Sequence, residues 1–170
     1  MLPRMNRIRA TLATIAILLP STVMASAPSP LGPNKGVFGD WTAATYGTGS
    51  AKICYAFTQP QHARPAVSSR GSAMLTVTER HGSRDEISIT PGFTYAKKPA
   101  VSMALGKTKI SFYVQDNTAF TDSVTEALAG FARESTTSVT STGPKGVKVT
   151  DKFSLTGFSA AYKAINKACP

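Results

Sequence analysis

The chain has two histidines, His62 and His81, and imidazole is the side chain that hydrolysis and metal binding most often use. His62 lies in a proline-rich stretch and His81 in a short turn. Neither has a histidine or cysteine at the spacing of a metal site. We therefore expect no bound metal and no cofactor. A site assembled in space from these histidines and two acids remains an alternative, because sequence spacing would not reveal it.

The usual motifs for a nucleophile or a phosphate loop do not accompany these histidines. The sequence has no G-x-S-x-G elbow of the kind that serine hydrolases use. The glycine-rich stretch at residues 47–50 lacks the lysine and the following helix of a phosphate loop. We expect no catalytic residue and a non-enzymatic protein, with a hydrolase of hidden site geometry as the alternative.

Charged residues of both signs surround His81. Residues 79–86 read Glu-Arg-His-Gly-Ser-Arg-Asp-Glu. Opposite charges across a glycine-containing turn favour a salt-bridged hairpin tip over a pair of catalytic carboxylates. Exposed loops on a rigid scaffold often contact partners. The hairpin tip is therefore a candidate partner contact, through Arg80, His81, Arg84 and Asp85.

The N-terminus has the three regions of a secretory signal peptide. Arginines at positions 4, 7 and 9 precede an apolar run at residues 10–19, which Pro20 ends. The run is about half the length that a membrane-spanning helix needs. Cleavage is expected after Ala25, because the alternative cut after Ala27 would leave Pro28 at the new terminus. We predict a periplasmic or secreted protein with no transmembrane segment in the mature chain.

The two cysteines, Cys54 and Cys169, allow only one intramolecular pairing. Export would place them in an oxidising compartment, where disulfides persist. A bridge would close a loop of more than a hundred residues, for which the chain-entropy model gives about 4–5 kcal/mol of stabilisation. We predict this disulfide, with two free thiols as the alternative.

The pattern of apolar residues predicts a mainly β protein. Residues 26–36 are rich in proline and glycine and are expected to be a flexible linker, followed by one domain at 37–170. Two helices are expected, near 123–133 and near 158–167. With about eight or nine strands, the domain should be an antiparallel β-sandwich or a partly open barrel. The segments with strand character are 38–46, 52–58, 73–80, 85–90, 100–105, 109–115, 135–142 and 147–155.

The positive charge excess is moderate and spread along the chain. The formal net charge is +10, and removal of residues 1–25 takes away three of those charges. Such an excess could favour anionic lipid or glycan. Lysines and aromatic rings alternate between residues 95 and 113, as in some binders of single-stranded nucleic acid. Core packing explains the rings equally well, and an exported protein seldom meets nucleic acid, so nucleic acid is not expected as a partner.

Two stretches of the sequence resemble the invasion-associated locus B family of exported envelope proteins of Gram-negative bacteria. The first is Phe-Gly-Asp-Trp at residues 38–41, and the second is Phe-Ser-Leu-Thr-Gly-Phe at residues 153–158. Cys-Tyr-Ala at residues 54–56 adds to the likeness. The resemblance covers roughly residues 37–170. It implies a non-enzymatic protein linked in some pathogens to host-cell entry. The partner would be an unidentified protein or another component of the envelope or the host surface.

One departure from the family bears on the cysteines. Many relatives carry a cysteine shortly after the tryptophan, where this chain has Thr45. The family's usual pairing therefore does not transfer, and the Cys54–Cys169 bridge rests on this chain alone. The family has no established catalytic residues that could be carried over.

Overall fold

Among the residues that the structure describes, twelve strands pair into one antiparallel sheet that does not close on itself. The computed structural model describes residues 27–68 and 70–170. The expected signal peptide at residues 1–25 lies outside the described residues, together with its preferred cleavage point. The order of strands along the sheet is β1-β3-β4-β6-β7-β10-β9-β8-β11-β12-β5, with β2 paired to β3.

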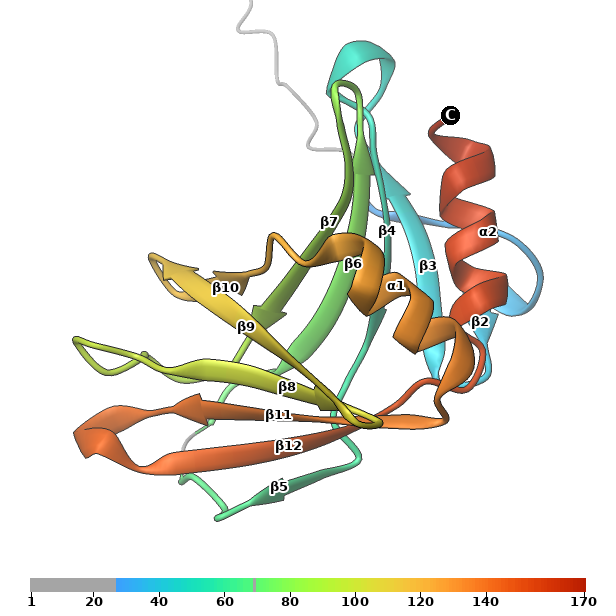
Figure 1. Cartoon of the computed structure of the whole chain (residues 1–170). Coiled ribbons are helices and arrows are strands. Elements are labelled where there is room, and N and C mark those ends of the chain that lie inside the picture. The colour runs from blue at the N-terminus through green and yellow to red at the C-terminus, as the bar shows by residue number, and fades with distance from the viewer. Residues whose placement is uncertain (1–26, 69) are drawn as a thin grey trace, which may run out of the picture.

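The strands fall into two halves that cross one another (Figure 1). One half contains β1 (Ser29–Pro30), β2 (Val37–Phe38), β3 (Trp41–Tyr46), β4 (Ile53–Thr58), β6 (Met74–Arg80) and β7 (Ser83–Thr90). The other half contains β5 (His62–Arg64), β8 (Val101–Leu105), β9 (Thr108–Gln115), β11 (Thr136–Thr142) and β12 (Lys148–Ser154). The short strand β10 (Thr118–Phe120) pairs with both β7 and β9 and so joins the halves.

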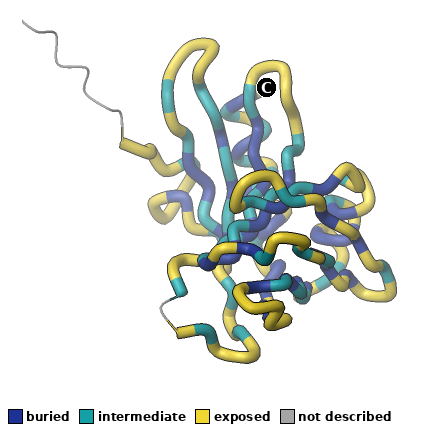
Figure 2. The backbone as a smooth tube through the Cα atoms, turned by 90° about the vertical axis from the view of Figure 1, so that its left-hand side faces the viewer, coloured by how far each residue is buried: buried dark blue, intermediate teal, exposed yellow. Residues whose placement is uncertain are grey.

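The strands form where the sequence alternates, and the alternation decides which side chains are buried. In β12, Val149, Asp151 and Phe153 face the interior, whereas Lys148 and Lys152 are exposed. In Figure 2 buried segments lie along the strands, and exposed segments lie mainly in the connecting loops. Strand β12 therefore has one side against the core and one polar side that faces outward.

Two helices cover the core side of the sheet (Figure 1). Helix α1 (Val124–Arg133) follows Ser123, which makes no side-chain capping bond. A Cβ at Gly130 of α1 would lie 2.0 Å from the Leu105 side chain, so glycine lets the helix approach β8 closely. Helix α2 (Phe158–Ala168) packs on β3 and β4. Short 3-10 turns occur at Asn34–Gly36, Gly49–Ala51 and Pro144–Gly146.

The predicted fold class is confirmed, and both helices lie where the apolar spacing placed them. The strand count is higher than expected, because four strands of two or three residues are too short to show alternation: β1, β2, β5 and β10. Part of the expected linker also contributes to the sheet, since Ser29 and Pro30 pair with β3. Neither α1 nor α2, the α-helices among the described residues, is long and apolar enough to cross a membrane.

Candidate functional site

The outward side of β5, β12, β11, β8 and β9 forms a polar surface, which we call the basic face. Register places its side chains in rows that cross the strands. His62 of β5 lies beside Lys152 of β12, and Lys152 lies beside Ser138 of β11. In the next row Arg64 lies beside Thr150, which pairs with Thr140. The sequence folds this way because the core takes the apolar positions of each strand and leaves the polar ones outside.

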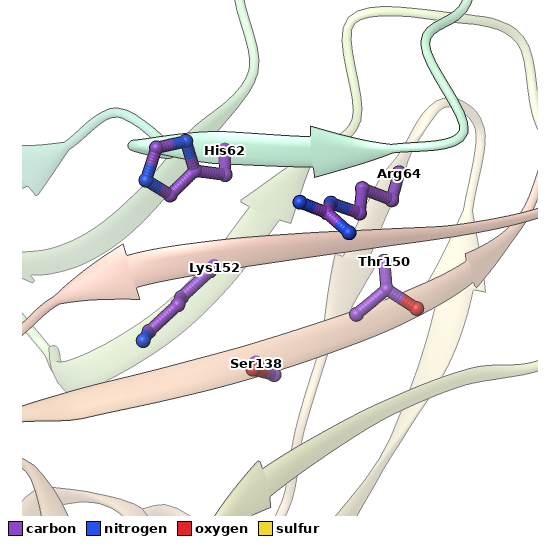
Figure 3. A pocket seen from close by; sticks show the side chains of 5 residues that line it. All are labelled: His62, Arg64, Ser138, Thr150 and Lys152. Atoms are coloured by element: carbon purple, nitrogen blue, oxygen red, sulfur yellow. The ribbon is translucent and has the colours of Figure 1, made fainter.

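A hollow of about 420 Å³ lies at the β5 end of the basic face. Its lining has three basic side chains and two hydroxyls: His62, Arg64, Lys152, Ser138 and Thr150. Figure 3 shows the side chains of His62 and Arg64 on β5 close to those of Lys152 and Thr150 on β12. Cationic groups beside hydroxyl donors are the usual ligands of an anionic oxygen.

A second hollow, of about 480 Å³, adjoins the first and shares Ser138 with it. Three lysines line it, Lys107, Lys109 and Lys148, together with the small side chains that face outward from β8 and β11. The hydroxyls of Thr140 and Thr150 lie 3.0 Å apart on the same face. The two hollows together make one shallow, hydroxyl-rich surface with cations near both ends.

The sign of the charge on the basic face follows from where the acids lie. Among the described residues, none that lines either hollow is acidic. Asp151, on the same strand as Lys152, faces the interior, where its two oxygens accept hydrogen bonds of 2.6 Å from Arg70. Arg70 also donates to the Pro91 carbonyl and lies over the Phe93 ring. At the rim, Glu134 lies near Gly106 and pairs with Arg133.

The two histidines line different hollows, and none of the residues that line either of these hollows is acidic. His62 shares its hollow with Ser138, but Lys152 lies between them in register. His81 lines a hollow of about 270 Å³ near the C-terminus, together with Lys52 and Cys169. In residues 27–68 and 70–170, no three His, Cys, Asp or Glu side chains are grouped as metal ligands.

The hairpin tip that the sequence singled out packs against α2 and the C-terminal residues. Arg80 pairs with Glu86 at 2.8 Å, as the charge pattern predicts for this hairpin. Arg84 donates to the Cys169 carbonyl and to Asn166. Asp85 accepts a hydrogen bond from the Tyr162 hydroxyl. Arg84 and Asp85 therefore help to hold α2, and contact with a partner through this tip stays a prediction.

A buried carboxylate, Glu79, lies beneath the tip. Its side chain is fully buried, and one oxygen is 3.1 Å from Arg84 and accepts from the backbone N–H of Asp85. The other oxygen has no hydrogen-bond partner in the described part of the chain. Burial raises the pKa of Glu79 to about 7, the Asp85 carboxyl adds to the rise, and the Asp85 N–H and Arg84 oppose it. Burial, and next its hydrogen bond to the Asp85 carboxylate, raise the pKa of the Tyr162 hydroxyl to about 12.

The predicted disulfide between Cys54 and Cys169 is present, with a Cα–Cα distance of 6.0 Å. It ties the end of α2 to β4. Thr45 lies directly opposite Cys54 on β3. The threonine hydroxyl donates a hydrogen bond of 2.9 Å to the Ile53 carbonyl, which adds a side-chain contact between β3 and β4.

Most residues of the basic face were not singled out from the sequence. Of the alternating lysines and rings between residues 95 and 113, Lys107 and Lys109 line the second hollow, whereas Tyr95 and Phe112 are buried in the core. Arg64, Ser138, Thr150 and Lys152 carried no local signal. The one available signal was the alternation along β12. Because successive side chains of a strand point to opposite sides, Lys148, Thr150 and Lys152 must share a face.

The two stretches that carry the family resemblance meet in the fold. The Asp40 N–H donates to the Thr156 carbonyl at 3.0 Å, and Trp41 packs edge-on against Phe158 with ring centroids 5.0 Å apart. A Cβ at Gly39 would lie 2.7 Å from the Thr156 carbonyl oxygen. These stretches therefore build the contact between β3 and the start of α2, and none of their residues is among those that line the two hollows of the basic face.

Comparison with family models gives a match over residues 41–166 to the family described as Invasion associated locus B (IalB) protein. Comparison with curated proteins and with solved structures gives no match. The matched range runs from Trp41 to Asn166 and includes nearly all of the sheet and most of α2. The chain belongs to the invasion-associated locus B family.

Proposed function

We propose that this protein is an exported, non-enzymatic binding protein that acts at the bacterial envelope or at a host-cell surface. Membership of the invasion-associated locus B family supports this role. The basic face is the surface through which the protein engages its partner, and that partner carries negative charge where it meets the face.

One observation carries the proposal: two adjoining hollows lie on one side of the sheet, and every charged or titratable side chain that lines them is basic. Cations gathered on a rigid sheet attract anionic groups more strongly than the same charges scattered over a surface. Asp151, which could have neutralised Lys152 from the same strand, faces inward and pairs with Arg70. Because the Asp151 side chain points inward, no carboxylate of β12 neutralises the positive charge of Lys148 and Lys152 on the outward side.

Export is supported by two features of the chain. The Cys54–Cys169 disulfide suits an oxidising compartment. The arginines and the apolar run at residues 1–19 have the order of a signal peptide. Fractionation of the producing cell tests this part of the proposal. The protein should be found in the periplasm or the medium, shortened at its N-terminus. Full-length protein in the cytoplasm would contradict export.

Binding is tested with two charge-matched double variants. Arg64→Gln with Lys152→Gln removes two cations from the basic face, and Lys163→Gln with Lys167→Gln removes two from the exposed side of α2. The purified proteins are then incubated with isolated envelopes and with host cells. Retention should fall at least about tenfold for the first variant, because charge-assisted contacts are lost. Equal retention of the two variants would contradict a role for the face.

A further inference from the structure

One row of side chains on the basic face crosses five strands and contains two of its lysines. Register places His62, Lys152, Ser138, Ala104 and Lys109 in one row. Neighbouring strands lie about 4.8 Å apart, so the row spans roughly 20 Å from His62 to Lys109. Lys152 lies beside His62 near one end, Lys109 lies at the other end, and the side chains between the two lysines are small. A ligand that uses the whole row must therefore be elongated and must carry negative charges at intervals.

The middle of the basic face is made of hydroxyls. The row next to the first one contains Thr150, Thr140, Ser102 and Ser111, and two of these hydroxyls lie 3.0 Å apart. A hydroxyl both donates and accepts, so such a row complements a ligand that is itself rich in hydroxyl groups. The small side chains also leave room for a chain to lie flat across the strands.

One aromatic ring completes the surface. Tyr113 follows Lys109 and Ser111 on the outward side of β9, its side chain is half exposed, and its ring lies against Phe120 with centroids 5.9 Å apart. A fixed, exposed ring is a platform for the apolar side of a sugar ring. Binders of single-stranded nucleic acid need several such rings for successive bases. Membrane-surface binders need a group of exposed apolar side chains.

We infer that the basic face binds a linear acidic polysaccharide, whose carboxylate or sulfate groups pair with the basic side chains while its hydroxyls meet the serine and threonine row. This inference rests on the proposed function and names the class of ligand for the same surface. In the hollow at the β5 end, Arg64 and Lys152 hold one acidic group with the Ser138 and Thr150 hydroxyls. Lys107 and Lys109 hold another at the β9 end, and Tyr113 stacks on a sugar ring.

The test uses heparin fragments of increasing length as the probe, titrated into the full exported protein by calorimetry at physiological ionic strength. Affinity should rise with length until a fragment spans the row and then level off. Arg64→Gln with Lys152→Gln should weaken binding at least about tenfold. Tyr113→Ala should also weaken it, whereas Lys163→Gln with Lys167→Gln should change it less than about twofold.

Several results would overturn the inference. Neutral dextran that binds as tightly as heparin would remove the role of charge. Equal weakening by the two double variants would show diffuse attraction. Tighter binding of single-stranded DNA, or of phosphatidylglycerol vesicles, would assign the face to another class of partner. If retention on envelopes depends on the basic face but heparin does not bind, this inference fails and the proposed function stands. If retention is also independent of the face, both fail.

Discussion

The indole of Trp41 donates a hydrogen bond of 3.1 Å to the backbone carbonyl of Ser154, 113 residues further along the chain. Trp41 is fully buried, and its ring also packs against Phe131 and Phe158. A buried indole N–H needs such a partner, because leaving it unpaired would cost free energy. Trp41 thus joins β3 to the end of β12 and helps to close the fold.

Gly157 makes the closest approach in this junction and gives the first prediction. Its φ is +92°, and a Cβ would lie 1.9 Å from the Phe38 carbonyl oxygen. Gly157→Ala should lower the free energy of unfolding by more than about 3 kcal/mol, because the backbone of residues 38–39 must move. Urea denaturation followed by tryptophan fluorescence measures the change.

Gly82 is the matched control for that substitution. Its φ is +76°, but no atom lies within 4 Å of the position that a Cβ would take. Gly82→Ala should cost only the strain of a left-handed backbone, about 1–2 kcal/mol. Equal losses for the two variants would contradict the steric role assigned to Gly157.

The fold was readable from the sequence where the signal is local. The serine, threonine and valine content of residues 135–142 predicts β11, residues 147–155 read as the strand that is β12, and the apolar spacing after Ser123 predicts α1. The basic face was not readable, because it depends on pairing between distant segments. His62 and Arg64 lie in a stretch that looks like a polar loop, and only its pairing with β12 brings them beside Lys152 and Thr150.

Glu79 shows why a charge pattern can mislead about burial. Among the alternating charges of residues 79–86 it reads as an exposed hairpin residue. The pairing of β6 with β7 shifts register between Thr78 and Arg80, and both Thr78 and Glu79 are buried there. Glu79 is in phase with the buried Leu75 and Val77 and lies opposite Cys54 of β4, so strand alternation itself places its side chain inside. Thr78 is the residue that the irregular pairing leaves out of phase.

The disulfide gives the second prediction. Cys54→Ser with Cys169→Ser should lower the free energy of unfolding by up to about 4–5 kcal/mol, because the bridge closes a long loop of the unfolded chain. Part of α2 should stay docked, since Lys52 still donates to the Ala168 carbonyl at 2.7 Å. Thermal unfolding with and without reductant measures the effect. The melting temperature of the double variant should not change when reductant is added. If the melting temperature of the wild type is also unchanged once both of its thiols are free, the prediction is contradicted.

The buried pair of Arg70 and Asp151 gives the third prediction. The exposed fractions of the two side chains are 11% and 1%, and two hydrogen bonds of 2.6 Å join them. Asp151→Asn should cost about 3–5 kcal/mol of stability, because it leaves the arginine charge buried without its partner. Replacing both residues, with Arg70→Met and Asp151→Leu, should recover much of that loss. A double-mutant cycle of Arg70→Met, Asp151→Leu and the two together, measured in urea, checks this, and strictly additive losses would contradict coupling between the two residues.

The pH dependence of stability gives the fourth prediction, through Glu79. Its pKa is about 7 in the folded protein, against 4.5 as the ordinary value. The folded state therefore binds the proton more tightly than the unfolded state does. Between about pH 4.5 and 7 this group's contribution to the free energy of unfolding falls as the pH rises. Glu79→Gln, which stays neutral, should remove that loss, which amounts to at most about 3 kcal/mol.

The comparison that isolates this effect is the stability of Glu79→Gln minus that of the wild type, measured in urea at several pH values. The difference should shift in favour of the variant as the pH rises from 4.5 to 7 and stay constant above that range, because Glu79 is then ionised in both states of the wild type. Glu86→Gln removes a carboxylate from the same hairpin whose side chain is partly exposed and pairs with Arg80, so it controls for the loss of charge alone. A difference that does not vary with pH would contradict the prediction, since Arg84 and the Asp85 N–H would then hold Glu79 ionised throughout.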